Sequence, residues 1–406
     1  MVPNGWEKHP VGKICRSIVP GRNKPKEFSG SIPWVTTPEI KGRYIPSLAQ
    51  QNYVSTEALS ECGGKIVPRG AVVMAAVGEL GLVAIASEEV VLNQQLHAFV
   101  CSGSVHNEYL AYWLSSQKPY METIASKTTI PYLNKTNCES IPVALPPPPE
   151  QRKIATILGT WDEAISTTER LIDNSKQQKK ALMQQLLTGK KRLLDDSGKP
   201  FEGKWTHGYL GDLCVFKGGS AFKEVYQGNS TGEIPFIKVS DMNLPRNRKF
   251  ICEANNWVTK NIAKEMKAKG FPKDAIVFAK VGAALLLNRR RILTRETIID
   301  NNMMAAIPLD SATTEFLYQI MLAIDFAKFV QDGAVPSVNQ SDLSKFKLTY
   351  PKRIEQEKIA SVLANADKEI ELLEQQLADL KQEKKALMQQ LLTGKRRVKI
   401  DDKEVA

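Results

Sequence analysis

The sequence has few of the residues from which metal sites and disulfide frameworks are built. Its 406 residues include four histidines and six cysteines, and no two cysteines form a CxxC pair. The histidines are not spaced with the cysteines as zinc ligands would be. We therefore expect buried free thiols in a reducing compartment, and no metal site.

The chain also lacks a hydrophobic run that could cross a membrane. The longest apolar stretch, residues 71–86, is interrupted by Glu79 and two glycines, so it is too short and too broken to span a bilayer. The first residues, "MVPNGWEKHPVGK", contain no apolar core of a signal peptide. These absences favour a cytoplasmic protein.

Motifs for nucleotide and methyl-transfer chemistry are missing as well. The sequence contains no GxxxxGK[ST] phosphate loop and no GxGxxG motif after a strand. It also has no Asn-Pro-Pro-aromatic motif of the kind that amino-methyltransferases place near a flipped base. "LPPPPE" at Leu145 has the prolines without the asparagine, and it predicts the start of a helix. A chain that itself cleaves or methylates DNA is therefore disfavoured.

Acidic residues are outnumbered by basic ones. Lys and Arg number 55 against 44 Asp and Glu, which gives a formal net charge of +11 and a pI near 9.2. Such an excess favours a polyanionic partner, either nucleic acid or an acidic membrane, although a basic protein without such a partner remains an alternative. The 42% hydrophobic content suits ordinary cores. The length predicts two or three domains of roughly 100–200 residues each.

The most informative feature present is an internal repeat. The stretch "KKALMQQLLTGK" at Lys179 recurs letter for letter at Lys384. Extended backwards, the segment that begins at Glu150 matches the one that begins at Glu355 at 24 of 43 positions without a gap. A repeat of this length indicates an internal duplication.

Both repeat segments are predicted to be long helices. They contain no internal proline and are rich in Ala, Leu, Gln, Glu and Lys. Prolines precede each start, and Gly189 and Gly394 follow the ends, as is typical of helix boundaries. Each helix would be roughly 60 Å long, and a helix of that length needs a partner in water. The simplest partner is the other copy.

The apolar residues of the two helices repeat every 3.5 rather than every 3.6 residues, which predicts a coiled-coil seam. Lys179 and Lys384 fall in the same layer of this seam. A lysine there either fixes the register or extends to the edge of the seam, and the sequence leaves both readings open. The apolar seam positions are Ile154, Leu158, Ile165, Leu182, Leu186, Ile359, Leu363, Ile370, Leu387 and Leu391.

The stretches between the helices match each other more weakly. "SIPWV" at Ser31 corresponds to "EIPFI" at Glu233, and "VPRGAVVMAAVG" at Val67 corresponds to "FPKDAIVFAKVG" at Phe271. Short β-rich runs broken by Gly, Pro and Asn predict two α/β (α+β) globules. We expect globular domains at 1–145 and 193–350, long helices at 146–192 and 351–397, and a tail at 398–406.

The linkers suggest that this plan is circular. From Gly189 to Trp205 there are 16 steps, and the 12 steps from Gly394 to Ala406 cover about the same distance once the segment up to Trp6 is added. Antiparallel packing of the two helices would place the globules at opposite ends. They would then be related by a pseudo-twofold axis.

Two helical repeats that begin EQxKIA, end in LLTGK and separate two divergent globules resemble the specificity subunit of type I restriction–modification enzymes. The resemblance covers essentially the whole chain. It implies that each globule is a target recognition domain that contacts one half of a bipartite, asymmetric double-stranded DNA site. The helices would act as a spacer between the two half-sites.

The resemblance also implies partners and cofactors. Two modification subunits, which bind S-adenosylmethionine and methylate adenine at N6, would dock on the paired helices. Two restriction subunits, which use ATP and magnesium, can join them. This chain itself would bind no cofactor and carry no catalytic residue.

Base edges in the major groove are read by Arg, Lys, Asn or Gln, and phosphates are bound by Lys, Arg, Ser, Thr or backbone N–H groups. Three stretches of the second globule offer such residues. The alternatives are a tight turn for "FKGGSAF", a solvated hairpin for "LNRRRIL" and a capped turn that opens a helix for "AVPSVNQSD". The candidate residues are Lys217, Gly218, Gly219, Ser220, Arg289, Arg290, Arg291, Ser337, Asn339 and Gln340.

The first globule offers two stretches, "PGRNKPK" with the threonines that follow "SIPWV", and "SKTTIPYLNK". Ordinary loops are the alternative for both. The candidate DNA-binding residues are Arg22, Lys24, Lys26, Thr36, Thr37, Lys127, Thr128 and Asn134.

A coiled-coil scaffold that joins proteins without sequence-specific DNA contact is the competing hypothesis for the whole chain. The charge excess and the divergence of the globules argue against it. Salt dependence separates the two, because a DNA reader that makes several phosphate contacts loses affinity steeply as salt rises.

Overall fold

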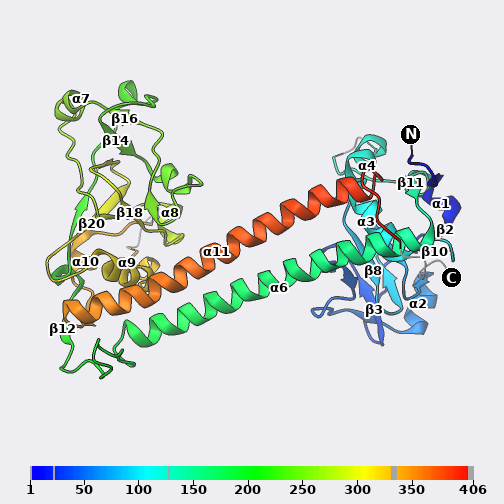
Figure 1. Cartoon of the computed structure of the whole chain (residues 1–406), viewed down its shortest axis with the longest axis horizontal. Helices are drawn as coiled ribbons and strands as arrows, with labels where there is room; N and C mark the ends of the chain where they lie inside the picture. Colours follow the sequence, from blue (N-terminus) through cyan, green and yellow to red (C-terminus); the bar gives the residue numbers. More distant parts are fainter. Residues whose placement is uncertain (1, 22, 127–128, 331–335, 401–406) are drawn as a thin grey trace. The chain divides into compact units, whose positions relative to one another are not determined.

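The computed structural model describes residues 2–21, 23–126, 129–330 and 336–400, and it divides into two compact units. Unit 1 comprises residues 1–169 and 375–406, and unit 2 comprises residues 170–374. Each unit contains one globule and a part of each of two long helices, α6 (Pro148–Leu186) and α11 (Arg353–Leu391), which are green and orange-red in Figure 1. Both predicted long helices are therefore present.

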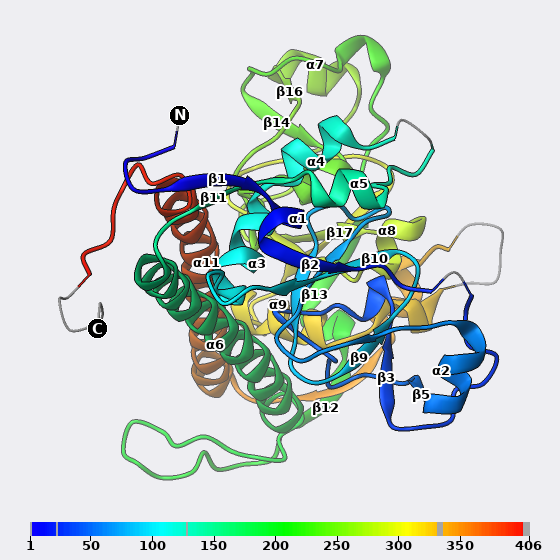
Figure 2. The same ribbon diagram turned by 90° about the vertical axis from the view of Figure 1, so that its right-hand side faces the viewer.

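The globule of unit 1 is built from three sheets. β1 (Glu7–Pro10) and β11 (Pro142–Leu145) form an antiparallel pair (Figure 2). A five-stranded sheet has the order β2 (Cys15–Ile18), β10 (Leu96–Cys101), β7 (Val72–Ala75), β8 (Val83–Ala86) and β4 (Tyr44–Ile45). A four-stranded sheet has the order β5 (Tyr53–Val54), β3 (Ile32–Val35), β9 (Val90–Leu92) and β6 (Ile66–Val67).

Short helices connect these strands. They are α1 (Val11–Ile14), η1 (Thr37–Glu39), α2 (Thr56–Cys62), α3 (Asn107–Ser116), α4 (Lys118–Ile124) and α5 (Lys135–Glu139).

The five-stranded sheet of unit 1 is covered on both faces, and the pattern of its central strand shows why. In β7, Val72 and Met74 belong to the core cluster that also contains α3, whereas Val73 and Ala75 belong to a second cluster on the opposite face. Successive residues of a strand point to opposite faces, so an uninterrupted apolar run fills both cores.

Unit 2 repeats this architecture. β12 (Thr206–Tyr209) pairs with β21 (Lys347–Tyr350). The five-stranded sheet has the order β13 (Cys214–Gly218), β20 (Met303–Pro308), β17 (Ile276–Ala279), β18 (Arg291–Leu293) and β15 (Phe250–Ile251). A three-stranded sheet has the order β16 (Trp257–Val258), β14 (Ile234–Ile237) and β19 (Ile298–Ile299).

The helices of the second globule are also short. They are η2 (Leu210–Asp212), η3 (Glu224–Tyr226), η4 (Val239–Asn243), α7 (Lys260–Glu265), α8 (Ala283–Leu286), α9 (Thr314–Ala323), η5 (Phe326–Phe329) and α10 (Gln340–Ser344).

The sequence correspondences between the globules agree with the fold. "VVMA" and "IVFA" form β7 and β17, each beside the long strand of its sheet, and "IPWV" and "IPFI" form β3 and β14. The mixed helix-and-sheet class and the duplicated plan predicted from the sequence are confirmed.

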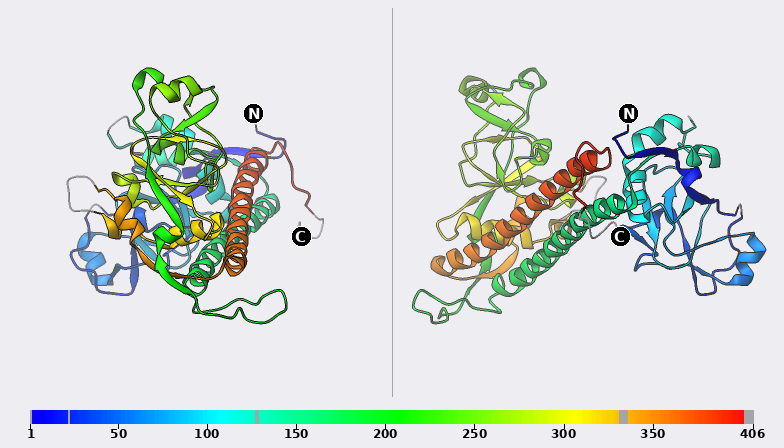
Figure 3. Two further views of the ribbon diagram at one scale, coloured as in Figure 1. Left: turned by 90° about the vertical axis from the view of Figure 1, so that its left-hand side faces the viewer. Right: turned by 45° about the vertical axis from the view of Figure 1, so that its right-hand side comes forward.

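Within each unit the two helix segments run antiparallel and pack on the globule. In unit 1, Ile154, Leu158 and Leu391 are buried in the main core cluster. In unit 2, where the green end of α6 and the orange end of α11 run side by side (Figure 3, right panel), Leu186 and Ile359 are buried in the corresponding cluster. The heptad pattern predicted a seam between helices. The structure adds that the seam residues near the helix ends belong to the cores of the globules.

All six cysteines are free. Four of them are buried, but Cys101 is half-buried and Cys252 is exposed, so the expectation of buried thiols does not hold at these two positions. Across residues 2–21, 23–126, 129–330 and 336–400, no helix has the length and apolar character needed to span a membrane. Within the same ranges, no group of His, Cys, Asp and Glu side chains is arranged to hold a metal ion.

Candidate nucleic-acid and partner sites

A buried carboxylate joins the first turn of α6 to the segment that follows α11. Glu150 is 3% exposed. Its two carboxylate oxygens accept hydrogen bonds from Arg397 Nε at 2.7 Å and Arg397 Nη2 at 2.8 Å. Trp6 Nε1 donates to the same carboxylate at 3.0 Å. A bidentate guanidinium pair fixes both the distance and the orientation of the groups it joins.

The same joint occurs in unit 2 with the roles of the helices exchanged. Glu355, in the first turn of α11, is 3% exposed and accepts from Arg192 Nε at 2.6 Å and Arg192 Nη2 at 2.7 Å. Trp205 Nε1 donates to Glu355 at 3.2 Å. In each unit, the end of one repeat is therefore tied to the start of the other.

The glutamine after each of these glutamates anchors the globule to the helix. Gln151 is fully buried, donates to the backbone oxygen of Ser104 at 2.9 Å and accepts from the backbone N–H of His106 at 2.8 Å. Gln356 likewise donates to Ser311 O at 2.8 Å and accepts from Thr313 N at 3.1 Å. The repeated "EQ" dipeptide thus serves one structural purpose twice.

The seam lysines are ion-paired. Lys384 pairs with Asp162 in unit 1, and Tyr112 Oη donates to the same carboxylate at 2.5 Å. Burial and this carboxylate both raise the pKa of Tyr112, so the phenol remains a donor. Lys384 lies 5.1 Å from the centre of the Tyr112 ring.

Unit 2 repeats the pattern with a different donor. Lys179 pairs with Asp367, and Gln319 Nε2 donates to Asp367 at 2.8 Å and to Glu315 at 3.1 Å. Only 12% of the Lys179 side chain is exposed. Of the two readings that the sequence left open, a lysine that fixes the register accounts for these contacts better than one that extends to the solvent.

Of the arginine cluster predicted to bind DNA, only Arg289 is exposed. Arg290 is 1% exposed, donates to Ile324 O at 3.0 Å and stacks 3.8 Å from the centre of the Phe326 ring. Burial lowers its pKa to about 9. Arg291 donates to the backbone oxygens of Met242 and Arg290. Arg290 is therefore buried and Arg291 half-buried, and both guanidinium groups form hydrogen bonds within the globule.

The glycines and amides of the second globule also have structural contacts. A Cβ on Gly219 would lie 2.0 Å from Asp300 O, so the glycine is required by the approach of two backbones. Asn339 caps α10 by accepting from Asp342 N at 2.8 Å. The side-chain amide of Gln340 bonds to Phe216 O and Gly218 N at 3.1 Å each. The capped turn that the sequence offered as an alternative is thus present at Asn339.

A shallow hollow of about 730 Å³ in unit 2 brings Ser337 together with Lys280. Lys280 is not among the residues that the sequence predicts to contact DNA. Its signal was present in the aligned stretches "VVMAAVG" and "IVFAKVG", where Lys280 stands opposite Ala76. The second globule therefore carries a cation at the end of a central strand where the first globule carries an alanine. Lys217 is exposed, and Gly218 and Ser220 are half-buried.

In the first globule, Lys24 and Lys26 are exposed. Thr36 donates to Glu39 at 2.7 Å, and the buried Thr37 donates to Gln95 at 3.2 Å. The side chain of Asn134 caps α5. The remaining candidates Arg22, Lys127 and Thr128 lie outside the described residues.

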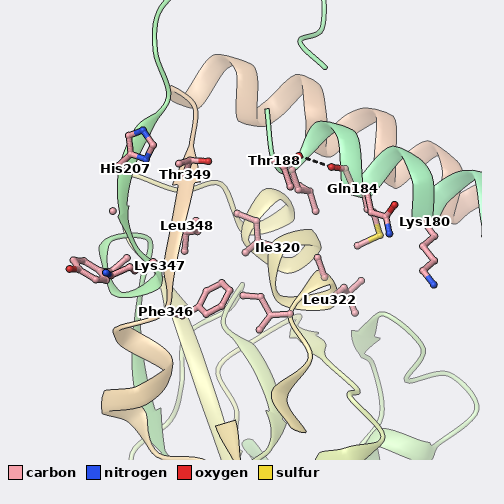
Figure 4. A pocket seen from close by; sticks show the side chains of 16 residues that line it. Lys180, Gln184, Thr188, His207, Ile320, Leu322, Phe346, Lys347, Leu348 and Thr349 are labelled. Carbon is pink, nitrogen blue, oxygen red and sulfur yellow. Dashed lines mark hydrogen bonds between the residues drawn. The ribbon is translucent and has the colours of Figure 1, made fainter. Parts of the chain in front are cut away.

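An apolar groove of about 900 Å³ lies in unit 2, between the last two turns of α6, α9 and the β12–β21 pair (Figure 4). Met183 lines it from α6, Leu187 lines it from just after the end of α6, and Ile320 lines it from α9. Lys180 and Lys347 stand among the lining residues.

The comparisons with known proteins agree with this architecture. The family model of the type I restriction modification DNA specificity domain matches residues 3–175 and 202–382. The MjaIX specificity subunit of Methanocaldococcus jannaschii is 25% identical over 98% of this chain and 95% of its own length. The EcoR124I/EcoR124II specificity subunit of Escherichia coli is 22% identical over 64% of this chain and 63% of its own length.

Two solved structures share the fold. The type I restriction–modification S subunit of M. genitalium superposes with a TM-score of 0.58 at 15% identity, covering 96% of this chain and 97% of that one. A chain from a type I system studied for its complex assembly and conformational transition gives a TM-score of 0.61 at 16% identity, covering 97% and 98%.

These findings define the class: a protein with two specificity domains of the type I restriction–modification kind. The chain belongs to this family, and it is a specificity subunit, the non-catalytic component of a type I restriction enzyme. The resemblance noted from the repeats is confirmed.

Proposed function

We propose that the chain reads a bipartite, asymmetric site on double-stranded DNA, with one half-site for each globule. One observation carries this proposal. The joints between globule and helix are the same in both units, down to the Trp–Glu–Arg contacts, whereas candidate contact positions on the globules differ, as at Ala76 and Lys280. Two globules that are attached to the helices in the same way but carry different surfaces suit the recognition of two different DNA half-sites.

The residues that we assign to DNA contact are the candidates whose side chains are accessible. Lysines and serines supply phosphate contacts and guanidinium groups can reach base edges. We assign the buried or backbone-bonded candidates to positioning instead. The proposed DNA-contacting residues are Lys24 and Lys26 in unit 1, and Lys217, Lys280, Arg289 and Ser337 in unit 2.

We further propose that two modification subunits dock on the long helices. Three large apolar side chains on these helices in unit 2 are open to solvent: Leu171 is 47%, Ile354 66% and Leu372 61% exposed. Exposed leucines on a helix surface are typical of protein–protein contacts. By contrast, the seam residues Ile154 and Leu158 are buried in the chain's own core and are not available to a partner.

In this proposal the chemistry belongs to the partners. S-adenosylmethionine would bind to the modification subunits, and ATP and magnesium to any restriction subunits. This chain would supply the DNA contacts and the geometry that brings a target adenine to the methyltransferase.

Methylation mapping tests the proposal directly. The chain would be co-expressed with its cognate modification subunit in a methylation-free host, and the DNA sequenced with detection of modified bases. Methyladenine confined to a split motif with two unlike halves, and absent without this chain, is the expected result. An assembled, active complex without any motif would contradict DNA reading.

That second outcome would favour the scaffold hypothesis, since the exposed leucines would still bind a protein. Salt distinguishes the two functions independently. Binding of a DNA reader with several phosphate contacts should weaken by orders of magnitude between about 50 and 200 mM salt.

A further inference from the structure

The groove in unit 2 is an apolar surface that the contacts described above leave uncovered. Met183 of α6 and Leu187, which directly follows that helix, are four residues apart and line the groove from one side. Ile320 lines it from α9, and Phe346 and Leu348 line it from the segment entering and forming β21 (Figure 4). Phe346 and Leu348 are only partly buried.

A different side chain occupies the corresponding place in unit 1. α3 and α9 have the same length and corresponding positions, so Trp113 stands where unit 2 has Ile320. The indole of Trp113 is 8% exposed and donates from Nε1 to Pro142 O at 2.8 Å, which spans the gap between α3 and β11.

The residues beside this position also differ between the two units, in how deeply they are buried. Ile141 and Val143 of unit 1 correspond to Phe346 and Leu348 of unit 2, because β11 and β21 match in length and position. Ile141 and Val143 are fully buried, whereas Phe346 and Leu348 are not. At this place unit 1 carries a tryptophan beside two fully buried residues, whereas unit 2 carries an isoleucine that lines the groove beside two residues that are only partly buried.

The shape and charge of the groove indicate what fits it. Two helices and a β-pair form its walls, and ridges of side chains four residues apart are the surface onto which a third helix packs. Lys180, Lys347 and His207 are among the described residues that line it, and none of those residues is acidic. An amphipathic helix with an apolar face flanked by carboxylates would match both properties.

We propose that this groove binds an acidic amphipathic helix of the modification subunit, so that the two copies of that subunit dock unequally, with the tighter site on unit 2. This inference rests on the proposed docking of modification subunits. It specifies where one helix of the modification subunit binds, and it gives a reason for the two docking sites to differ in affinity.

The groove can be filled by a substitution that unit 1 already carries. Ile320→Trp places an indole where Trp113 lies in the other unit. Val225→Trp is the matched control, because Val225 is 77% exposed on the same unit, outside the lining of the groove. Lys180→Glu with Lys347→Glu reverses the charges at the groove while both side chains remain exposed.

The experiment is a calorimetric titration of each purified full-length chain with the purified cognate modification subunit, with the stoichiometry checked by native mass spectrometry. The wild type should bind two copies, the first at least tenfold tighter than the second. Ile320→Trp should weaken the tighter site at least tenfold and make the two sites similar. The double charge reversal should weaken the same site, and Val225→Trp should change neither.

Several results would overturn the inference. Two equal sites in the wild type, or an Ile320→Trp chain that binds like the wild type, would show that the groove holds no partner helix. An apolar small molecule of a few hundred daltons retained by the purified wild-type chain, and lost with Ile320→Trp, would assign the groove to a ligand instead. If the wild type binds no modification subunit at all, the proposed docking itself fails, a result distinct from equal binding.

Discussion

Arg397 and Glu150 stand 247 positions apart and form a bidentate ion pair. Arg397 follows the end of the second sequence repeat, and Glu150 opens the first. Arg192 and Glu355 form the same pair in the other unit. The same spacing between Glu and Arg in the two repeats is therefore matched by the same ion pair in the two units.

Loss of the Arg397 guanidinium should destabilise unit 1. Arg397→Ala leaves the buried Glu150 carboxylate with Trp6 as its side-chain donor. We expect a cost of roughly 2–3 kcal/mol, somewhat less than for a fully buried pair because 45% of the arginine side chain is exposed. Chemical denaturation of the full chain would measure it.

Arg192→Ala provides the matched experiment in unit 2, where Glu355 plays the part of Glu150. A similar cost is expected there. Lys395→Ala, at an exposed neighbouring position, serves as the control and should leave stability unchanged. Equal stability of Arg397→Ala and the wild type would show that this ion pair does not stabilise unit 1.

His97 should make the stability of unit 1 depend on pH. It is 3% exposed, its ring hydrogen-bonds to Ser17 Oγ at 2.6 Å, and burial lowers its pKa to about 4 from an ordinary value of 6.5. The unfolded state therefore binds the proton first as pH falls. Stability is complete above pH 6.5 and declines by up to about 3 kcal/mol as the pH drops toward 4.

Unit 2 supplies the control substitution for this histidine. Met304 occupies the position of His97 in the long strand of the second sheet. His97→Met should remove most of the loss between pH 6.5 and 4, as followed by urea denaturation at a series of pH values. An unchanged pH profile would place the titrating group elsewhere.

The distance between the recognised half-sites should follow the length of the helix pair. Seven residues inserted after Glu169 in α6 and seven after Glu374 in α11 leave the contacts within each unit intact, because both points are unit boundaries. The addition of about 10 Å should lengthen the DNA spacer by about three base pairs. Methylation mapping should show this change with both half-sites unaltered.

An insertion in α6 alone is the informative counterpart. It would shift one helix by two turns against the other, so that ion pairs such as Lys179–Asp367 and Lys384–Asp162 could no longer all form. We expect the complex to lose DNA methylation, rather than to methylate a site with a longer spacer. Altered half-sites with an unchanged spacer, in the double insertion, would refute the role of the helices as a ruler.

The thiols should react in a defined order. Cys252 is exposed and should be alkylated by iodoacetamide at pH 8 within minutes. Burial raises the pKa of Cys138 and of Cys214 to about 12, so both should stay protonated and protected until the chain unfolds. Peptide mass spectrometry over time reads the order directly. Early labelling of Cys214 would indicate local opening of β13, and Cys252→Ser should abolish the fast phase.

The sequence alone determined the duplicated plan. Two nearly identical segments without proline, with a 3.5-residue apolar period and glycine at each end, can only form long paired helices, because local propensity and periodicity agree over more than ten turns. The β-rich runs between the helices are short, but they occur in both halves of the chain. Each run therefore strengthens the prediction of a strand at the matching position in the other half. "VVMA" and "IVFA" became equivalent central strands for this reason.

The tertiary structure decided the roles of individual polar residues. In "LNRRRIL", three adjacent arginines look alike, yet Arg289 is exposed while Arg290 stacks on Phe326 and Arg291 bonds to distant backbone oxygens. Burial depends on residues brought together from far along the chain, and no local pattern encodes it. The pairing of Glu150 with Arg397, and the hydrogen bond of Trp113 to Pro142 where unit 2 has the groove beside Ile320, were decided in the same way.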